Sequence, residues 1–250
     1  MKYLKYLLWT LLAGVLILQG YFFIQILLWR WVNPETTAFQ RAELQRLCST
    51  SKICALKKDW IPLKEISPTL RRAVMISEDS DFYRHHGFEL KAMKEAWQRN
   101  QQKGKHLRGG STITQQLAKN LFLSGEKNYI RKGQEFIITG MLELLLSKDR
   151  IFEIYLNHVE WGEGIFGIAA ASRHYYALSP KQLGIQESAA LAAALPAPKC
   201  FDQQRYCAKA RINFPNRIEF ILEWLARQNQ RNAAPVELDE RILIEEESEN

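Results

Sequence analysis

The chain has 250 residues, of which 47% are hydrophobic and 24% are charged, and its formal net charge is +7. This composition excludes a wholly disordered chain and is sufficient for one globular domain. Because the same chain contains a membrane-spanning candidate, the positive charge favours anionic lipid or a phosphate-bearing substrate over nucleic acid.

The uncharged run from Leu7 to Trp29 is the strongest physical signal in the sequence. It exceeds the ~20 residues that cross a bilayer. A cleaved signal peptide is the alternative, but its apolar region is shorter and ends in small residues, whereas this run ends in the large side chains of Leu27–Trp29. Lys2 and Lys5 precede the run and Arg30 follows it, so the flanking charges favour a cytoplasmic N-terminus.

The chain is therefore divided as follows. Residues 1–32 are predicted to form a cytoplasmic tip and a transmembrane anchor. Residues 33–60 lack strong apolar periodicity and are predicted to be a linker. The folded domain is predicted over residues 61–228, and residues 229–250 to be a solvated acidic tail.

Apolar spacing predicts a series of helices within the domain. Ser67 and Pro68 form a typical helix start, and this first helix ends near Glu78. Four further helices are predicted to begin at Ser111, at Arg131 with its end near His158, at Pro180 and at Pro215. Loops are expected around Gly87, Gly109–Gly110 and Gly162–Gly167. There is no convincing alternating strand pattern, so the predicted fold class is all-α.

The four cysteines occur as two close pairs, Cys48 with Cys54 and Cys200 with Cys207. An oxidising compartment would allow disulfides, although spacing alone does not give the pairing. A zinc site is a weaker alternative because neither pair has Cys-x-x-Cys spacing or a neighbouring histidine. The third possibility is that all four cysteines are unpaired thiols.

Acidic, basic and aromatic residues gather from Glu78 to Gly87, directly after an apolar helix. A carboxylate there could be partly shielded from water, which raises its pKa and suits a general base. A solvated acidic loop explains the same composition. Although Glu89 stands four residues after His85, the paired histidines four residues apart that mark a metal-binding helix are missing, so no metal cage is predicted.

A glycine-rich segment, Arg108–Asn120, precedes a predicted helix whose face carries Gln115, Gln116 and Lys119. The glycines permit close backbone approach, and a helix N-terminus attracts anions. An exposed polar face is the alternative. The segment has neither a Walker nor a dinucleotide pattern.

The third segment, Lys127–Glu135, places Arg131 and Glu135 one helical turn apart. Taken alone, this spacing predicts only a surface salt bridge between Arg131 and Glu135.

Taken in order, the three segments resemble the peptidoglycan glycosyltransferases, the domain found in bifunctional penicillin-binding proteins and, behind one anchor, in monofunctional transglycosylases. The matching patterns are Glu-Asp-x-x-Phe-x-x-His-x-Gly at Glu78–Gly87, Gly-Gly-Ser-Thr-Ile-Thr-Gln-Gln-x-x-Lys-Asn at Gly109–Asn120, and Arg-Lys-x-x-Glu at Arg131–Glu135. Two further stretches fit, Ser147–Asn157 with Gly162–Gly167, and Glu187–Pro198. The resemblance covers about residues 61 to 225.

The resemblance implies a lysozyme-like helical fold that polymerises lipid II and releases undecaprenyl pyrophosphate, with the catalytic domain on the periplasmic side of the bacterial inner membrane. Glu78 would be the general base on the acceptor, and Glu135 the second, donor-side carboxylate. Lys119, Lys127 and Arg131 would surround the donor pyrophosphate. The other implied substrate-binding residues are Asp79, Phe82, His85, Gly109, Gly110, Ser111, Thr112, Gln115, Gln116 and Asn120.

Two positions depart from the family pattern. Lys127 stands where arginine is usual, which replaces a bidentate phosphate contact by a point charge. Glu89 stands where aspartate is usual and keeps the charge. No cofactor is assigned, and a divalent cation, Mg or Mn, at the pyrophosphate stays open. The implied partners are lipid II, the growing glycan, the membrane and other cell-wall synthesis and division proteins.

Three other functions are weighed against this one. A cell-wall hydrolase could use the same kind of scaffold, but it has no pyrophosphate to neutralise. A non-catalytic membrane scaffold would not need both Glu78 and Glu135. A transpeptidase is disfavoured because Ser49–Lys52 and Ser124–Lys127 match only a short Ser-x-x-Lys pattern, and Lys-Thr-Gly does not follow.

Overall fold

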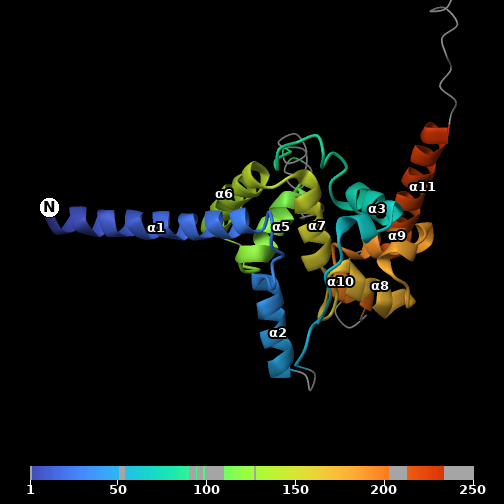
Figure 1. The fold of residues 1–250 in the computed structure, drawn as a ribbon, viewed down its shortest axis with the longest axis horizontal. Coiled ribbons are helices and arrows are strands. Elements are labelled where there is room, and N and C mark those ends of the chain that lie inside the picture. The colour runs from blue at the N-terminus through green and yellow to red at the C-terminus, as the bar shows by residue number, and fades with distance from the viewer. Residues whose placement is uncertain are drawn as a thin grey trace, which may run out of the picture.

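The computed structural model describes residues 2–50, 54–89, 94, 98, 110–126, 128–202 and 213–233. The described part is mainly helical, which confirms the all-α prediction. Figure 1 shows one long helix, α1 (Lys2–Leu28), projecting from a body in which the other helices pack together. The body carries the segments that were singled out in the sequence.

Within the described residues, α1 is the helix that is long and apolar enough to cross a membrane. Its first part projects from the body, and its large side chains are exposed, as with Trp9 at 68%. Its second part packs on the body, where Phe22 and Trp29 contact Phe122 with ring centroids 4.8 and 5.1 Å apart. So many exposed apolar side chains are unfavourable in water and favourable in the hydrocarbon core of a bilayer. Helix α1 is therefore consistent with a single-pass anchor.

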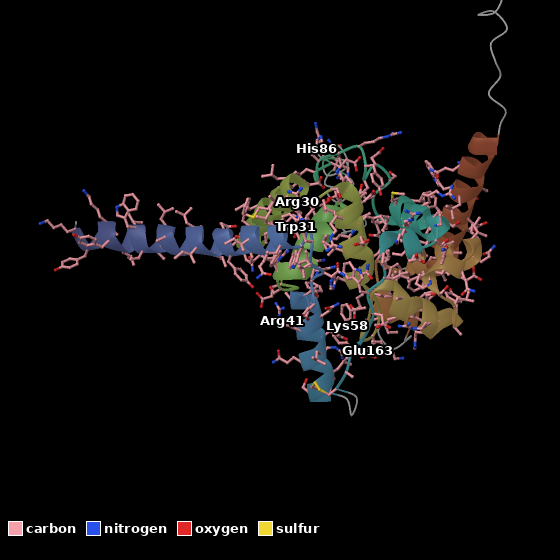
Figure 2. The ribbon with its side chains drawn as sticks, viewed as in Figure 1. Arg30, Trp31, Arg41, Lys58, His86 and Glu163 are labelled. Carbon is pink, nitrogen blue, oxygen red and sulfur yellow. A yellow bond between two sulfur atoms is a disulfide. The ribbon has the colours of Figure 1, made fainter. Side chains whose placement is uncertain are left out.

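The end of α1 is tied to the body at the place where Figure 2 shows Arg30 and Trp31. Arg150 donates from Nε to the carbonyl of Trp29 at 2.7 Å and from Nη2 to the carbonyl of Val32 at 2.9 Å. The guanidinium thus donates to carbonyl groups that the end of a helix leaves without partners. The anchor is therefore joined to the domain by side-chain packing and by hydrogen bonds.

The segment predicted as a linker differs from that prediction, because it contains helix α2 (Ala38–Thr50). Thr37 and Gln40 cap its start reciprocally, with both backbone-to-side-chain distances at 3.1 Å. Leu47 is buried, and α2 packs on α5. A disulfide joins Cys48, in the last turn of α2, to Cys54 beyond the end of the helix. Cys207, a member of the other predicted pair, lies outside the described residues.

Helix α3 (Pro68–Glu78) begins after Ser67 and ends at Glu78, as predicted. Helix α5 (Ile113–Phe122) begins slightly later than the predicted start at Ser111, because Thr112 is the residue that caps it. The Thr112 hydroxyl accepts from the backbone of Gln115, and the Gln115 side chain accepts from the backbone of Thr112. This capping box fixes the start of the glutamine-rich helix.

The single long helix predicted from Arg131 to His158 is wrong. The structure has two helices there, α6 (Tyr129–Leu145) and α7 (Lys148–His158). Ser147 separates them, and its hydroxyl accepts from the backbone of Arg150 at 3.2 Å, which caps α7.

The remaining elements are short helices and a small sheet. No helix was predicted between Gly167 and Pro180, where the structure has α8, and the helix predicted at Pro180 is a 3-10 turn followed by α9. In the sheet, whose order is β1-β3-β2, β1 is parallel and β2 antiparallel to β3. The bounds are η1 (Leu63–Glu65), β1 (Lys57–Lys58), β2 (Glu160–Gly162), β3 (Ile165–Phe166), α8 (Ile168–Tyr176), η2 (Pro180–Gln182), α9 (Ile185–Ala194), α10 (Pro198–Asp202) and α11 (Phe214–Ala233).

Two sets of helices meet around the end of α3. Helix α3 packs against α9 and α11, and Figure 1 shows these three together on the side of the body away from α1. Helix α5 packs against α6 and α7. Gln116 of α5 contacts Glu78, so the last residue of α3 lies where the two sets meet.

Candidate active site

Glu78, the predicted base, lies at the end of α3 with its side chain only 11% exposed. Its two carboxylate oxygens have different partners. Gln116 Nε2 donates to Oε2 at 2.9 Å. Ser77 Oγ lies 3.1 Å from Oε1, and Arg217 Nη2 lies 3.7 Å from the same oxygen. The carboxylate is thus held by α3, α5 and α11.

Burial raises the pKa of the Glu78 carboxyl above its ordinary value. The hydrogen bond from Gln116, the charge of Arg217 and the hydrogen bond from Ser77 act in the opposite direction, while the charge of Asp79 adds to the rise. A carboxylate with a raised pKa accepts a proton more readily near neutral pH than an exposed one. Glu78 therefore has the chemistry of a general base.

Gln116 joins Glu78 to the core of the body. Its Oε1 accepts from the hydroxyl of Tyr155 at 3.0 Å, while its Nε2 donates to Glu78. Tyr155 is fully buried, and burial together with the charges of Glu78 and Asp79 raises the pKa of its hydroxyl well above the ordinary value. The tyrosine therefore stays a hydrogen-bond donor and fixes the orientation of the Gln116 amide.

Asp79 and His85 form a frame beside the base. Asp79 is buried and accepts from His85 Nε2 at 2.8 Å and from the backbone of Ile113 at 2.9 Å. The backbone of Gly87 donates to His85 Nδ1, so the ring proton is on Nε2. Burial raises the pKa of Asp79, and both of its hydrogen bonds oppose that rise. The frame ties the loop after α3 to the start of α5.

Gly87 is a point of close approach in this loop. Its φ is +83°, and a Cβ there would lie 2.8 Å from Glu143 Cγ and 2.9 Å from Thr139 Cγ2. Its carbonyl accepts from the Thr112 hydroxyl at 2.7 Å. Glycine is therefore required by both backbone conformation and space.

Phe82 is fully buried, and Lys148 Nζ lies 4.5 Å from the centre of its ring. Lys148 also donates to Glu143 at 2.8 Å, and Thr114 donates to the same carboxylate oxygen at 2.5 Å. The structure thus gives Asp79, Phe82 and His85 supporting positions, and their predicted contact with substrate stays a prediction. Glu143 and Lys148 are members of this frame that the sequence reading did not assign.

A second carboxylate, Glu135, lies on α6 with 3% of its surface exposed. Arg131 Nη1 donates to Oε2 at 2.7 Å, and Lys132 Nζ forms an ion pair with Oε1. Arg131 was predicted, whereas Lys132 was missed although its i,i+3 spacing to Glu135 was visible in the sequence. Both oxygens of Glu135 thus face cations.

Lys119 links the two carboxylates electrostatically. Burial lowers the pKa of its amine, and both Glu135 and Glu78 act to raise it. Its Nζ lies 5.3 Å from the centre of the Phe39 ring of α2. Lys119 therefore lies within electrostatic range of both carboxylates, with Glu78 on one side and Glu135 and its two cations on the other.

The other predicted site residues lie on or before α5. Gly110 and Ser111 are half-buried just ahead of the helix, and Thr112, Gln115 and Asn120 are buried. Gly109 and Lys127 lie outside the described residues, so their roles stay predictions. No group of three metal-binding side chains occurs in the described ranges.

Ser77 and Arg217 are the contacts of the base that sequence reasoning missed. Arg217 comes from α11, far from Glu78 in the chain. Nothing in the sequence of this amphipathic helix indicates that Arg217 contacts Glu78. Ser77 directly precedes the predicted base, but serine at a helix end has many ordinary roles.

Comparison with known proteins places the whole site inside one family region. A family model described as "Transglycosylase" matches residues 45–225. A biosynthetic peptidoglycan transglycosylase from Cupriavidus metallidurans is 57% identical over 215 residues, covering 86% of this chain and 92% of its own length. A protein of the same name from Ralstonia nicotianae is 52% identical over 222 residues, covering 88% and 95%. Apart from Phe39, every residue of the site described above lies within the matched region.

Proposed function

Because the chain belongs to the transglycosylase family, we propose that it polymerises lipid II into β-1,4-linked glycan strands and releases undecaprenyl pyrophosphate. The observation that carries this proposal is a shielded carboxylate on one side of Lys119 and a second carboxylate with its two cations on the other. A base and a pyrophosphate clamp are the two parts that this glycosyl transfer needs.

In the proposed reaction, the 4-hydroxyl of the acceptor sugar gives its proton to Glu78. Its oxygen forms a bond to the anomeric carbon of the donor, while the bond from that carbon to the pyrophosphate breaks. The configuration at the anomeric carbon inverts, because attack and departure occur on opposite faces. Gln116 and Tyr155 hold the base during this step.

Lys119, Arg131 and Lys132 are proposed to stabilise the negative charge that grows on the departing pyrophosphate. Glu135 holds Arg131 and Lys132 in place before the donor arrives. Lys127 is proposed as a further cation of this clamp. No residue needs to form a covalent intermediate.

We also propose that the chain is a single-pass protein of the bacterial inner membrane with its catalytic domain in the periplasm. Ile130, Ile137 and Leu144 recur every two turns of α6 and are 88%, 48% and 77% exposed. An apolar stripe of this kind, on a helix that packs against α1, suits the outer part of the bilayer. The Cys48–Cys54 disulfide supports an oxidising compartment.

The chain covers 92% of the length of its Cupriavidus relative, a biosynthetic peptidoglycan transglycosylase. Contacts with other cell-wall synthesis and division proteins are proposed from the function alone.

The test is an assay of the detergent-solubilised full chain with labelled lipid II, with and without a chelator. Formation of long glycan by the wild-type chain, and its loss in Glu78→Gln with an unchanged circular dichroism spectrum, are expected. Glu219→Gln, at an exposed position on α11, is the matched control and should keep full activity. Shortening of added glycan strands without polymer would instead identify a hydrolase.

A further inference from the structure

Arg217, near the start of α11, touches the base although none of the recognised motifs contains it. Its Nη2 donates to Ser77 Oγ at 2.9 Å and lies 3.7 Å from Glu78 Oε1. Its Nε is buried and has no hydrogen-bond partner in the described part of the chain. Gln116 holds the other oxygen, Oε2. Arg217 and Gln116 thus hold the carboxylate by its two different oxygens.

Ser77 has one hydroxyl proton and two acceptors within reach. Its Oγ lies 3.1 Å from Glu78 Oε1 and 2.9 Å from the carbonyl of Ala192. Because Arg217 donates to Oγ, the hydroxyl proton is left to point at one acceptor or the other. A charged carboxylate attracts this proton more strongly than a carbonyl group does, and a protonated carboxyl attracts it less. The Ser77 hydroxyl can therefore donate to Glu78 when that carboxylate is charged and to the carbonyl of Ala192 when it is protonated.

We propose that Arg217 is a positioning residue for the base, which holds Glu78 in its charged form directly and through Ser77. This inference rests on the role of Glu78 in the proposed function. It assigns to the last described helix, α11, a part in catalysis: the packing of α11 on α3 sets the distance between the guanidinium and the carboxylate.

The other groups around Glu78 determine how strongly its pKa is raised and how much of that rise Arg217 opposes. Burial raises the pKa of Glu78, and the charge of Asp79 raises it further. Lys119 of α5 acts on Glu78 as a second cation, and Tyr155 of α7 is a neutral hydroxyl. The Arg217 side chain is 34% exposed, so solvent weakens its effect. Arg217 is therefore expected to lower the pKa of Glu78 only modestly.

The experiment is the pH profile of kcat/KM for lipid II polymerisation by the full chain, compared among wild type, Arg217→Gln and Arg217→Lys. In Arg217→Gln the acidic limb of the profile should move to higher pH by about one unit, which is a loss of about tenfold on that limb. Activity should return towards the wild-type value at alkaline pH. Arg217→Lys keeps the positive charge and should move the limb less.

Arg227→Gln is the matched control, because Arg227 lies on the same helix, is 62% exposed and pairs only with Glu223 among the described residues. Its profile should equal that of the wild type. An equal loss at every pH in Arg217→Gln, with the acidic limb unmoved, would overturn the inference.

Thermal unfolding of each variant shows whether Arg217→Gln still folds. If it does not, Ser77→Ala provides the test, because it removes the hydroxyl that links Arg217 to Glu78, and an unmoved limb in that variant overturns the inference. The failure of the proposed function looks different: Glu78→Gln would then keep its polymerase activity. If Glu78→Gln is inactive and the limb of the Arg217 variants is unmoved, only the role of Arg217 fails.

Discussion

The side-chain nitrogen of Gln116 lies 2.9 Å from Oε2 of Glu78, and this hydrogen bond joins α5 to the end of α3. The amide cannot turn over without placing its oxygen against the carboxylate and its nitrogen against the hydroxyl of Tyr155. Tyr155 thereby sets the direction in which Gln116 donates. Tyr155 does not touch Glu78, but it orients the amide that does.

Gln116→Ala is expected to lower kcat/KM by about 10- to 100-fold, because a hydrogen bond to a charged group contributes roughly 1.5–3 kcal/mol. Loss of the donor also raises the pKa of Glu78, so the acidic limb of the pH profile should move to higher pH. Gln186→Ala, at an exposed position on α9, is the control. Unchanged kinetics in Gln116→Ala would contradict the role given to this residue.

Lys132→Met is expected to raise KM for the donor lipid by roughly tenfold, because it removes one of the cations proposed to face the pyrophosphate. The control is Lys181→Met, whose lysine is 68% exposed and lies 3.7 Å from Glu65. Steady-state kinetics with labelled lipid II measure both constants. A normal KM in Lys132→Met would mean that Lys132 serves only to hold Glu135.

Gly87→Ala is expected to destabilise the domain by more than ~1 kcal/mol, because its φ of +83° is strained for alanine and the new Cβ would meet Glu143 and Thr139. Gly140→Ala is the matched comparison. Nothing lies within 4 Å of a Cβ at Gly140, and alanine there should stabilise α6 by up to about 1 kcal/mol. Equal unfolding temperatures for the two variants would refute the packing described around Gly87.

Glu160→Gln tests a buried acid outside the active site. Burial raises the pKa of Glu160 from 4.5 to about 7, against the opposing charge of Lys199. The folded state therefore binds more protons than the unfolded state between these values, and wild-type stability falls as the pH rises through them. The free energy of unfolding of the variant should exceed that of the wild type by as much as ~3 kcal/mol at pH above 7. Near pH 4 the two should be equal. Chemical denaturation at both pH values measures the difference, and a pH-independent difference would contradict the assignment.

Much of the site was predictable because its chemistry is carried by local sequence patterns. The start of α3, the carboxylate at its end and the helical spacing of Arg131 and Glu135 could be read from the sequence, and the resemblance of the three segments together predicted that they form a site. The break between α6 and α7 was missed because the apolar positions continue through it, and the cap formed by Ser147 outweighs that continuity. Helix α2 was missed because its buried side chains are partly polar, as at Gln40 and Glu43.

The rest of the site depends on contacts between residues far apart in the chain. Arg217 meets Ser77 only because α11 packs on α3, and Tyr155 meets Gln116 only because α7 packs on α5. Periodicity shows which face of a helix is apolar, but it does not show which helix will cover that face. These residues therefore could not be assigned before the packing was known.

The contact between Gln19 and Gln134 gives the anchor a mechanical role. The two amides exchange hydrogen bonds of 2.8 and 2.9 Å, one residue before Glu135 in α6. Since Phe22 and Trp29 also pack against Phe122, α1 is joined to the domain at several points near its end. With α1 in a bilayer, the depth of this one helix would set the height of Arg131 and Lys132 above the membrane. An unrelated membrane segment of equal length would still tether the enzyme, but it would leave its catalytic groups free to tilt away from the lipid-borne phosphates.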